Sequence, residues 1–419
     1  MPTCLTPGPG EVRVRLAVAG ICNSDWHMVQ GELRRDFPRI LALYLAGKFK
    51  LDELISQRYR LDQINEANAN LLTGAPATSS SFLMEHSTMA PFDYQDFDRE
   101  IWHKELEDFV PGTIYDMHTH MWCEAHKGAL TGAPDGLRLE IDYQDHLDWA
   151  AKLYPGREFH LLVLGTPIPG MDAEGHNDWM AQELKADPES AINMMVTPDM
   201  SPEYVAEQVD KHNFLGLKPY RTFASDPAEA RIRDFLPEHL IELAHDMGLA
   251  ITMHLSKRIG PADPENQEDL ERYTRQYPRA QWILAHCARA FNAFMMEGAI
   301  EFLCGLPNIW YDTSAVNDMY THFLLMEHED RRRVMFGSDN IVAGCARGKY
   351  VTYGHAWEYF AGHGDLPHCN PTPTLVIYEQ LRQERQVADM LDLTPDEIED
   401  HFSRNAQRFL SMMREGRSS

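Results

Sequence analysis

From residue 111 onward, short apolar runs alternate with amphipathic segments. Eight runs have the length and composition of strands, and helical patterns such as "PEYVAEQVDKHN" lie between most of them. Eight such alternations in about 230 residues predict an α/β protein with a (β/α)8 TIM barrel. A doubly wound sheet is the alternative, but it would need a glycine-rich phosphate turn, and no GxGxxG occurs. The predicted strands are 114–118, 159–166, 191–197, 214–218, 249–254, 281–286, 308–313 and 333–338.

The chain before this alternating region follows other patterns. Residues 1–75 alternate apolar and polar positions and then become helical, whereas residues 76–110 are loop-like and begin with the small, polar stretch "APATSSSF". We therefore predict three parts: an N-terminal segment (1–75), a linker and lead-in segment (76–110), and the barrel (111–419).

Composition narrows the class of protein. A content of 44% apolar and 24% charged residues is ordinary for a globular protein. The net charge of -26 argues against nucleic acid or an anionic membrane as a partner, because both are polyanions. The seven cysteines include no CxxC pair, and no apolar stretch approaches the ~18 residues of a membrane span. With no signal-peptide pattern at the N-terminus, we expect a cytoplasmic protein.

Polar residues stand at the C-terminal ends of several predicted strands, where barrel enzymes carry their chemistry. The run "IYDMHTHMW" ends the first strand with His118 and His120. Their side chains share one face because strand residues alternate with a period of two. Imidazole and carboxylate groups suit a divalent ion such as zinc. Singly, each residue has an ordinary explanation as a core histidine, a turn or a salt-bridged lysine, but together they predict a metal site. The residues at later strand ends are Lys218, His254, His286 and Asp339.

The order of these residues resembles the amidohydrolase superfamily. The similarity covers about residues 111–412 and includes "DMHTH", "GLKPY", "TMHLS", "LAHCAR", "FGSDN" and the closing "DEIEDHFSRNAQRFL". It is similar in particular to the branch that contains lactonases, hydratases and the aminocarboxymuconate-semialdehyde decarboxylase type. Enzymes of this branch act on small molecules, and many are dimers, so the resemblance also allows a homodimer.

The resemblance implies one divalent metal ion, with Zn2+ as the first choice and Mn2+ or Fe2+ as alternatives. It implies that Asp339 accepts the proton of the attacking water and that His286 acts as an acid or base beside the metal. Lys218 has two alternative roles, as a carboxylated bridge to a second metal or as a holder of a substrate anion. The implied metal ligands are His118, His120, His254 and Asp339.

Three arginines follow the ends of predicted strands 4, 5 and 6, namely Arg221, Arg258 and Arg289. A guanidinium group binds a carboxylate in a bidentate way, so these residues indicate a carboxylated substrate. Simple surface solvation is the alternative explanation for each of them.

The expected reaction is hydrolysis of a C–N or C–O bond in an amide, ester or lactone, by hydroxide that the metal makes available at neutral pH. The same set of residues also suits a metal-dependent decarboxylase or hydratase. A non-catalytic barrel is disfavoured because the ligand set is complete.

The N-terminal segment resembles a different family. Residues 10–32, "GEVRVRLAVAGICNSDWHMVQGE", resemble the start of zinc-dependent medium-chain alcohol dehydrogenases, and residues 36–74 resemble their end. The middle of that family is missing, and with it the nucleotide-binding turn and the zinc partners of Cys22. We therefore interpret residues 1–75 as the remnant of an internally deleted dehydrogenase, and we expect no NAD binding and no hydride transfer.

Overall fold

The computed structural model describes residues 94–126, 140–166, 170–340, 344–360, 368–369 and 372–417. All of them belong to Thr88–Ser419, the second of two units into which the chain divides. The predictions for residues 1–75 and for the first part of the linker lie outside the described residues. Within the described part, no helix is long and apolar enough to cross a membrane.

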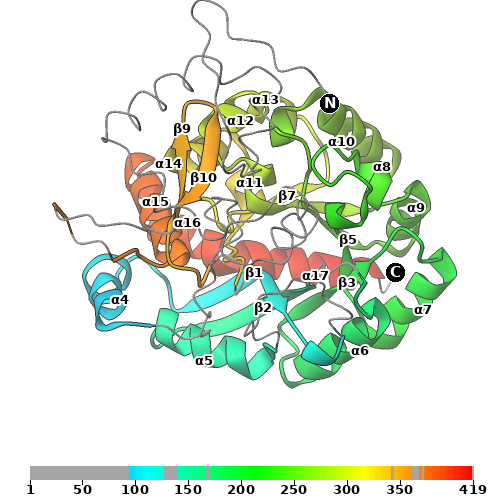
Figure 1. Cartoon of the computed structure of the whole chain (residues 1–419), viewed down its shortest axis with the longest axis horizontal. Coiled ribbons are helices and arrows are strands. Elements are labelled where there is room, and N and C mark those ends of the chain that lie inside the picture. Colours follow the sequence, from blue (N-terminus) through cyan, green and yellow to red (C-terminus); the bar gives the residue numbers. More distant parts are fainter. Residues whose placement is uncertain are drawn as a thin grey trace, which may run out of the picture. The chain divides into compact units, whose positions relative to one another are not determined.

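Eight parallel strands form one sheet in the order of the sequence, as predicted (Figure 1). The chain beyond the last strand returns to the first: the Met117 N–H donates to the Phe336 carbonyl at 3.0 Å, and the Asp339 N–H donates to the His118 carbonyl at 2.8 Å. These bonds close the sheet, and the prediction of a (β/α)8 barrel is confirmed. The strands are β1 (Thr113–Met121), β2 (Glu158–Gly165), β3 (Ala191–Val196), β4 (Gly216–Pro219), β5 (Ala250–Met253), β6 (Gln281–Leu284), β7 (Ile309–Asp312) and β8 (Val334–Met335).

Helices cover the outside of the barrel, and local signals set their ends. In α7 the Ser201 side chain accepts from the Tyr204 N–H and proline occupies the first turn, while α9 ends at Gly248 with a φ of 64°. The longer helices are α5 (Tyr143–Leu153), α6 (Ala173–Glu183), α7 (Pro202–His212), α9 (Glu238–Met247), α10 (Pro264–Gln276), α14 (Met319–His328), α15 (Val376–Met390) and α17 (Asn405–Arg417). The shorter ones are α8 (Ile232–Phe235), α11 (Ala285–Arg289), α12 (Ala293–Glu297), α13 (Ile300–Cys304) and α16 (Pro395–Glu399).

Two elements differ from the expectations. The lead-in segment, expected to be loop-like, contains α4 (Asp96–Ile101) and the π-helical turn η3 (Trp102–Leu106), because Trp102 is fully buried against the barrel. A hairpin of β9 (Lys349–Tyr353) and β10 (Ala356–Phe360) follows the eighth strand and was not predicted. It packs on the loop after β6, where the Trp357 and Phe291 rings stack with centroids 4.5 Å apart.

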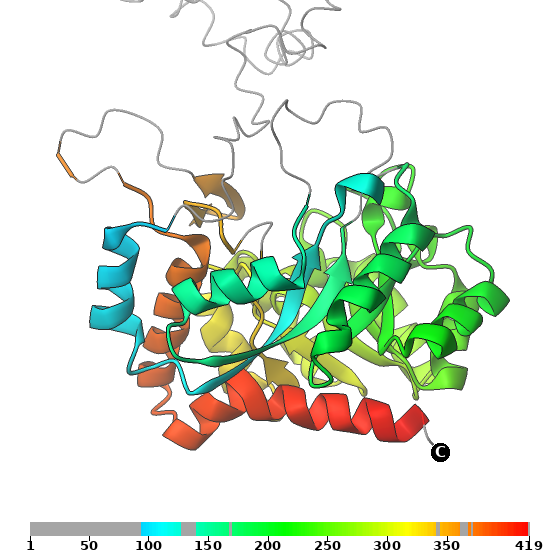
Figure 2. The same ribbon diagram turned by 90° about the horizontal axis from the view of Figure 1, so that it is seen from below.

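The C-terminal helix α17 runs along the underside of the barrel (Figure 2). Its buried Phe409, Leu410 and Met413 belong to the same apolar cluster as Met117 of β1 and Ile283 of β6. The helix therefore seals the end of the barrel opposite to the ends of the strands that carry the predicted site.

Replacing Phe409 with alanine should lower the free energy of unfolding by about 3–5 kcal/mol, because it opens a cavity in this cluster. The exposed Ser411 on the same helix provides the control, and Ser411→Ala should change stability by less than about 0.5 kcal/mol. Urea denaturation of both variants measures the difference. Equal stability of the two would show that α17 does not seal the barrel.

Candidate metal centre

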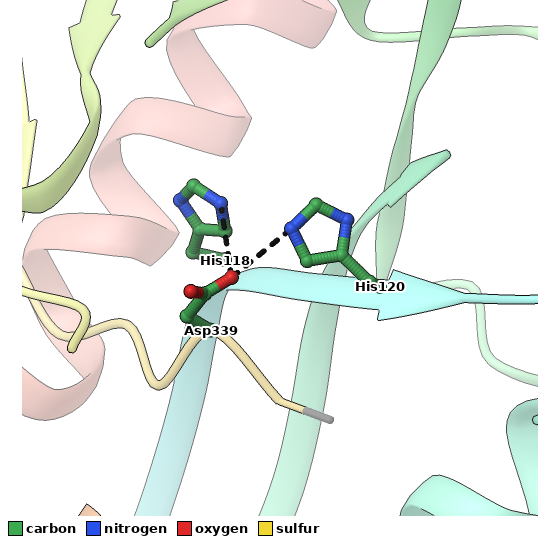
Figure 3. A group of neighbouring side chains, drawn as sticks. All are labelled: His118, His120 and Asp339. Carbon is green, nitrogen blue, oxygen red and sulfur yellow. Dashed lines mark ion pairs between the residues drawn. The ribbon is translucent and has the colours of Figure 1, made fainter. Parts of the chain in front are cut away.

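Three potential ligands meet where the sheet closes. His118 and His120 lie in the last part of β1, and Asp339 lies in the turn after β8 (Figure 3). The Asp339 Oδ1 atom is 3.1 Å from His120 Nε2 and 3.7 Å from His118 Nε2. Two ligand atoms on a tetrahedral zinc ion lie about 3.3 Å apart, given metal–ligand bonds of about 2.0–2.1 Å. The donor set and its spacing therefore fit a divalent cation of this size.

The other nitrogen of each histidine is held by the protein. His118 Nδ1 lies 2.9 Å from Asp312 Oδ2, and His120 Nδ1 lies 3.3 Å from the Gly165 carbonyl. Both partners are acceptors, so each Nδ1 carries the proton and each Nε2 keeps its lone pair. This arrangement orients a metal-binding imidazole and makes it more basic.

A metal ion binds a neutral imidazole or an ionised carboxylate, and the surroundings of these side chains favour those protonation states. Burial lowers the pKa of His118 to about 3, and this imidazole is neutral at pH 7. Burial opposes the charge of Asp339, but the surrounding imidazole groups of His120, His286 and His118 outweigh burial and lower the pKa of Asp339 to about 2.

Asp312, at the end of β7, belongs to the candidate site and was not among the residues predicted from the sequence. It is fully buried and accepts from His118 Nδ1, from the His286 N–H at 3.0 Å and from the Ser314 N–H at 3.2 Å. Burial opposes its charge, but His118, His286 and Ser314 hold the pKa of Asp312 well below its usual range. The missed signal was a carboxylate at the end of the predicted strand 308–313, since strand ends carry the chemistry of a barrel.

His286 and His254 extend the group along the barrel mouth. The ring centroid of His286 lies 4.7 Å from that of His118 and 5.1 Å from that of His254. Ligand atoms of His118, His286 and Asp312 form a second group close enough for a metal, while His254 belongs to neither compact group. The Nδ1 atom of His254 is bonded to the Leu255 carbonyl at 2.9 Å, which leaves its Nε2 for a ligand or substrate.

The protonation of His286 follows from its neighbours. Its Nδ1 lies 2.9 Å from Ser314 Oγ and 3.0 Å from the Ser314 carbonyl. The only proton of that hydroxyl is donated to Asp312, so His286 Nδ1 must be the donor. Burial lowers the pKa of His286, and its neutral ring presents Nε2 as an acceptor.

His286 lies in an unusual turn. The four residues from His286 to Arg289 have φ values of 58°, 51°, 61° and 63°, although none of them is glycine. Left-handed backbone costs roughly 1–2 kcal/mol per residue, so other contacts must hold it. The Asp312 carboxylate accepts from the His286 N–H, and Arg289 Nη1 donates to the Ser256 carbonyl at 3.2 Å.

Lys218 is fully buried at the end of β4, and its ammonium group lies 5.0 Å from the centre of the Tyr220 ring. Burial lowers its pKa to about 8, although Asp312 and Asp339 oppose that shift. Its Nζ atom has no hydrogen-bond partner among the described residues. A buried cation without a partner is costly, so this position is suited to an anionic group.

The three predicted arginines separate into two environments. Arg221 and Arg289 are partly buried beside His254, and burial together with the charge of Arg221 lowers the pKa of Arg289 to about 10. Neither forms an ion pair with a described carboxylate. The side chain of Arg258 is 90% exposed and pairs with Glu229 at 3.3 Å, as the alternative of surface solvation predicts.

Replacing Asp312 with asparagine should weaken zinc binding about 10–100-fold, because His118 loses the carboxylate that orients it. Competition with a chromogenic chelator measures the affinity. Asp187 provides the matched control, since it accepts from His160 Nδ1 at 3.0 Å at the other end of the barrel. Zinc affinity that is equal in Asp312→Asn and Asp187→Asn would contradict the role assigned to Asp312.

Comparisons with known proteins find two families in different parts of the chain. Residues 8–50 match the family described as the alcohol dehydrogenase GroES-like domain. Alcohol dehydrogenase B of Mycobacterium tuberculosis (strain ATCC 25618 / H37Rv) is 39% identical over 44 residues, which are 10% of this chain and 12% of that protein. The chain thus spans only about an eighth of the curated relatives it matches. The predicted resemblance of the N-terminal segment to dehydrogenases is confirmed for these residues.

The comparison with solved structures finds chains that are similar to this one. Amidohydrolase 2 from Bifidobacterium longum subsp. infantis is 15% identical, with 72% of this chain and 99% of that chain covered and a TM-score of 0.46. A 5-carboxyvanillate decarboxylase from Sphingomonas paucimobilis is 16% identical with the same coverage and a TM-score of 0.46. A 4-oxalomesaconate hydratase from Rhodopseudomonas palustris is 16% identical, with 72% and 96% covered and a TM-score of 0.46. The profile of the family described as Amidohydrolase matches residues 115–412, most of the chain, and this protein belongs to that family.

Proposed function

We propose that the barrel is a metal-dependent hydrolase that cleaves an amide, ester or lactone bond of a small carboxylated molecule. The observation that carries the proposal is the convergence of His118 Nε2, His120 Nε2 and Asp339 Oδ1 at one point, with distances of 3.1 and 3.7 Å to the carboxylate oxygen. Nδ1 of both histidines is engaged elsewhere, so the Nε2 atoms are left to bind a cation.

The proposed cofactor is one divalent ion, with zinc as the first choice because its usual ligands are imidazole and carboxylate. Manganese and iron(II) accept similar ligands. We assign His118, His120, His254 and Asp339 as its ligands, and a second ion would require carboxylation of Lys218. A bound ion would act as a Lewis acid and lower the pKa of a water to about 7.

The residues around this point would have different roles in the reaction. Asp339 is ionised, and its second carboxylate oxygen would accept the proton of the attacking water. His286 offers the lone pair of Nε2, which supports a role as general base more than as hydrogen-bond donor to an oxyanion. Lys218 would hold an anionic part of the substrate, because its ammonium group lacks any other partner among the described residues.

A metal-dependent decarboxylase or hydratase is the second candidate, and it is equally well supported. Lys218, Arg221 and Arg289 are buried or partly buried cations at the barrel mouth with no ion-pair partner among the described residues. Such a group of cations would bind a substrate carboxylate, which a decarboxylase needs as the group that it removes.

Product analysis separates the two reactions. The zinc-loaded protein would be incubated with panels of lactones, amides and unsaturated or aromatic carboxylic acids. We expect the hydrolysed acid as product, without carbon dioxide. Release of carbon dioxide without hydrolysis would replace the hydrolase with a lyase.

The metal centre itself is tested by elemental analysis. His118→Ala and Asp339→Asn should each reduce bound zinc to the background level and abolish turnover, since each removes a ligand. His103 is exposed on η3, and His103→Ala should keep the zinc content of the wild type. Unchanged zinc content in the first two variants would remove the basis of the proposal.

The arginine pair is tested by steady-state kinetics on the substrate so identified. Arg289→Ala should raise KM roughly 10–100-fold, because a hydrogen bond to a charged group contributes about 1.5–3 kcal/mol. Arg258→Ala should leave KM unchanged, since that side chain is solvated and paired with Glu229. Equal effects of the two substitutions would contradict a carboxylate site at Arg289.

The remaining predictions concern the surroundings of the enzyme. We infer a cytoplasmic location from the cysteine pattern, and a small molecule rather than nucleic acid or membrane as partner from the acidic charge. The homodimer stays a prediction. The absence of NAD binding also stays one, and saturable binding of NAD at micromolar levels would contradict it.

A further inference from the structure

A buried side-chain amide joins the chain after β7 to the chain after β8, and both segments adjoin residues of the candidate metal centre. Gln380 lies on α15 and has no exposed surface. Its Oε1 accepts from the Ala315 N–H at 2.8 Å, and its Nε2 donates to the Gly337 carbonyl at 2.9 Å and to Glu384 Oε1 at 2.9 Å. Thr313 Oγ1 lies 3.4 Å from the same nitrogen. The amide thus bonds to the chain after β7 and to the chain after β8 at the same time.

Both of these turns position groups of the proposed site. Asp312, the last residue of β7, accepts from His118 Nδ1, and Ser314 in the turn after β7 accepts from His286 Nδ1. The turn after β8 carries Asp339, two residues beyond Gly337. The distance between the two turns therefore contributes to where Asp312, which orients the His118 ring, lies relative to the Asp339 carboxylate.

Each turn also contains a residue in left-handed backbone, Ala315 with a φ of 59° and Asp339 with a φ of 60°. Such residues persist where surrounding contacts determine their conformation. The bond from the Ala315 N–H to Gln380 Oε1 is one of these contacts, and the bond from Gln380 Nε2 to the Gly337 carbonyl holds the other turn two residues before Asp339.

Only an amide satisfies these partners together. Position 380 must offer one acceptor to the Ala315 N–H and two donors to the Gly337 carbonyl and Glu384. A carboxylate has no protons to donate, and an apolar side chain would leave buried backbone groups unpaired, at about 1–3 kcal/mol each.

A second connection leads from the same network to the turn after β8. The other oxygen of Glu384, Oε2, lies 3.6 Å from His401 Nε2. The backbone carbonyl of His401 accepts from the Phe336 N–H at 3.0 Å, directly before Gly337. The amide therefore holds this stretch of chain from α15, and the segment that precedes α17 holds it through the backbone bond at Phe336.

We propose that Gln380 is a positioning residue that sets the spacing between the histidine side and the Asp339 side of the metal centre. It touches no proposed ligand and acts through Ala315 and Gly337. The inference rests on the metal centre proposed above, and it assigns to a helix on the outside of the barrel a part in forming that centre.

The test compares the zinc affinities of Gln380→Glu, which keeps the shape and removes both donors, and Gln380→Met, which removes all the polar contacts. Leu381→Ala provides the matched control, because Leu381 is the fully buried neighbour on the same helix and packs only in the apolar core. Each metal-free protein would be titrated with zinc against a chromogenic chelator, and its Tm would be measured with and without zinc.

We expect both Gln380 variants to bind zinc about 10–100-fold more weakly than the wild type. Losses of this size are typical when a residue that supports metal ligands, without binding the metal itself, is replaced. Leu381→Ala should bind zinc within about twofold of the wild type although its Tm falls. With a substrate in hand, kcat of the Gln380 variants should fall more than KM rises.

The inference is overturned if the Gln380 variants lose stability as Leu381→Ala does but keep wild-type zinc affinity. It is also overturned if neither Gln380 variant folds while Leu381→Ala does, because Gln380 would then be required by the barrel as a whole. Failure of the proposed function looks different: the wild type itself would bind no zinc, or His118→Ala would bind it unchanged.

Discussion

The closing seam between β1 and the chain after β8 is the interaction on which the site depends. Backbone bonds from the Met117 N–H to Phe336 and from the Asp339 N–H to His118 join residues more than 200 positions apart in the sequence. Buried Asp116 strengthens the seam by accepting from the Ser338 N–H at 2.9 Å, and burial raises the pKa of this carboxyl to about 7. Without the seam, the two histidines and the carboxylate would have no common point.

Near the seam, hydrogen bonds from residues that are not proposed ligands hold the histidines and the turns of the site. Asp312 orients one histidine through its ring and another through its backbone, and Gln380 ties the turn after β7 to the turn after β8. The left-handed turn that begins at His286 is also supported by residues outside the proposed ligand set. Strained backbone of this kind persists only where surrounding contacts hold it. The geometry of the candidate metal centre therefore depends on several turns as well as on the strand ends.

The two family matches are not equally strong evidence for the activity of this protein. The dehydrogenase match covers residues 8–50 and about an eighth of the curated proteins, while the amidohydrolase match covers residues 115–412 and the described convergence of ligands. Chemistry depends on groups that meet in space, so the proposed activity is placed in the barrel. Naming the chain from its N-terminal segment would rest the reaction on a match to about an eighth of the curated dehydrogenases.

The sequence alone determined the eight strands, their order and the positions of His118, His120 and Asp339 at strand ends. This worked because apolar periodicity is local and because parallel strands of a barrel all end at one face. The tertiary structure decided what depends on distant contacts: the partner of His118, the left-handed turn at His286, and the exposure of Arg258. No local pattern encodes those features, because each is set by a side chain or strand brought close only when the barrel closes.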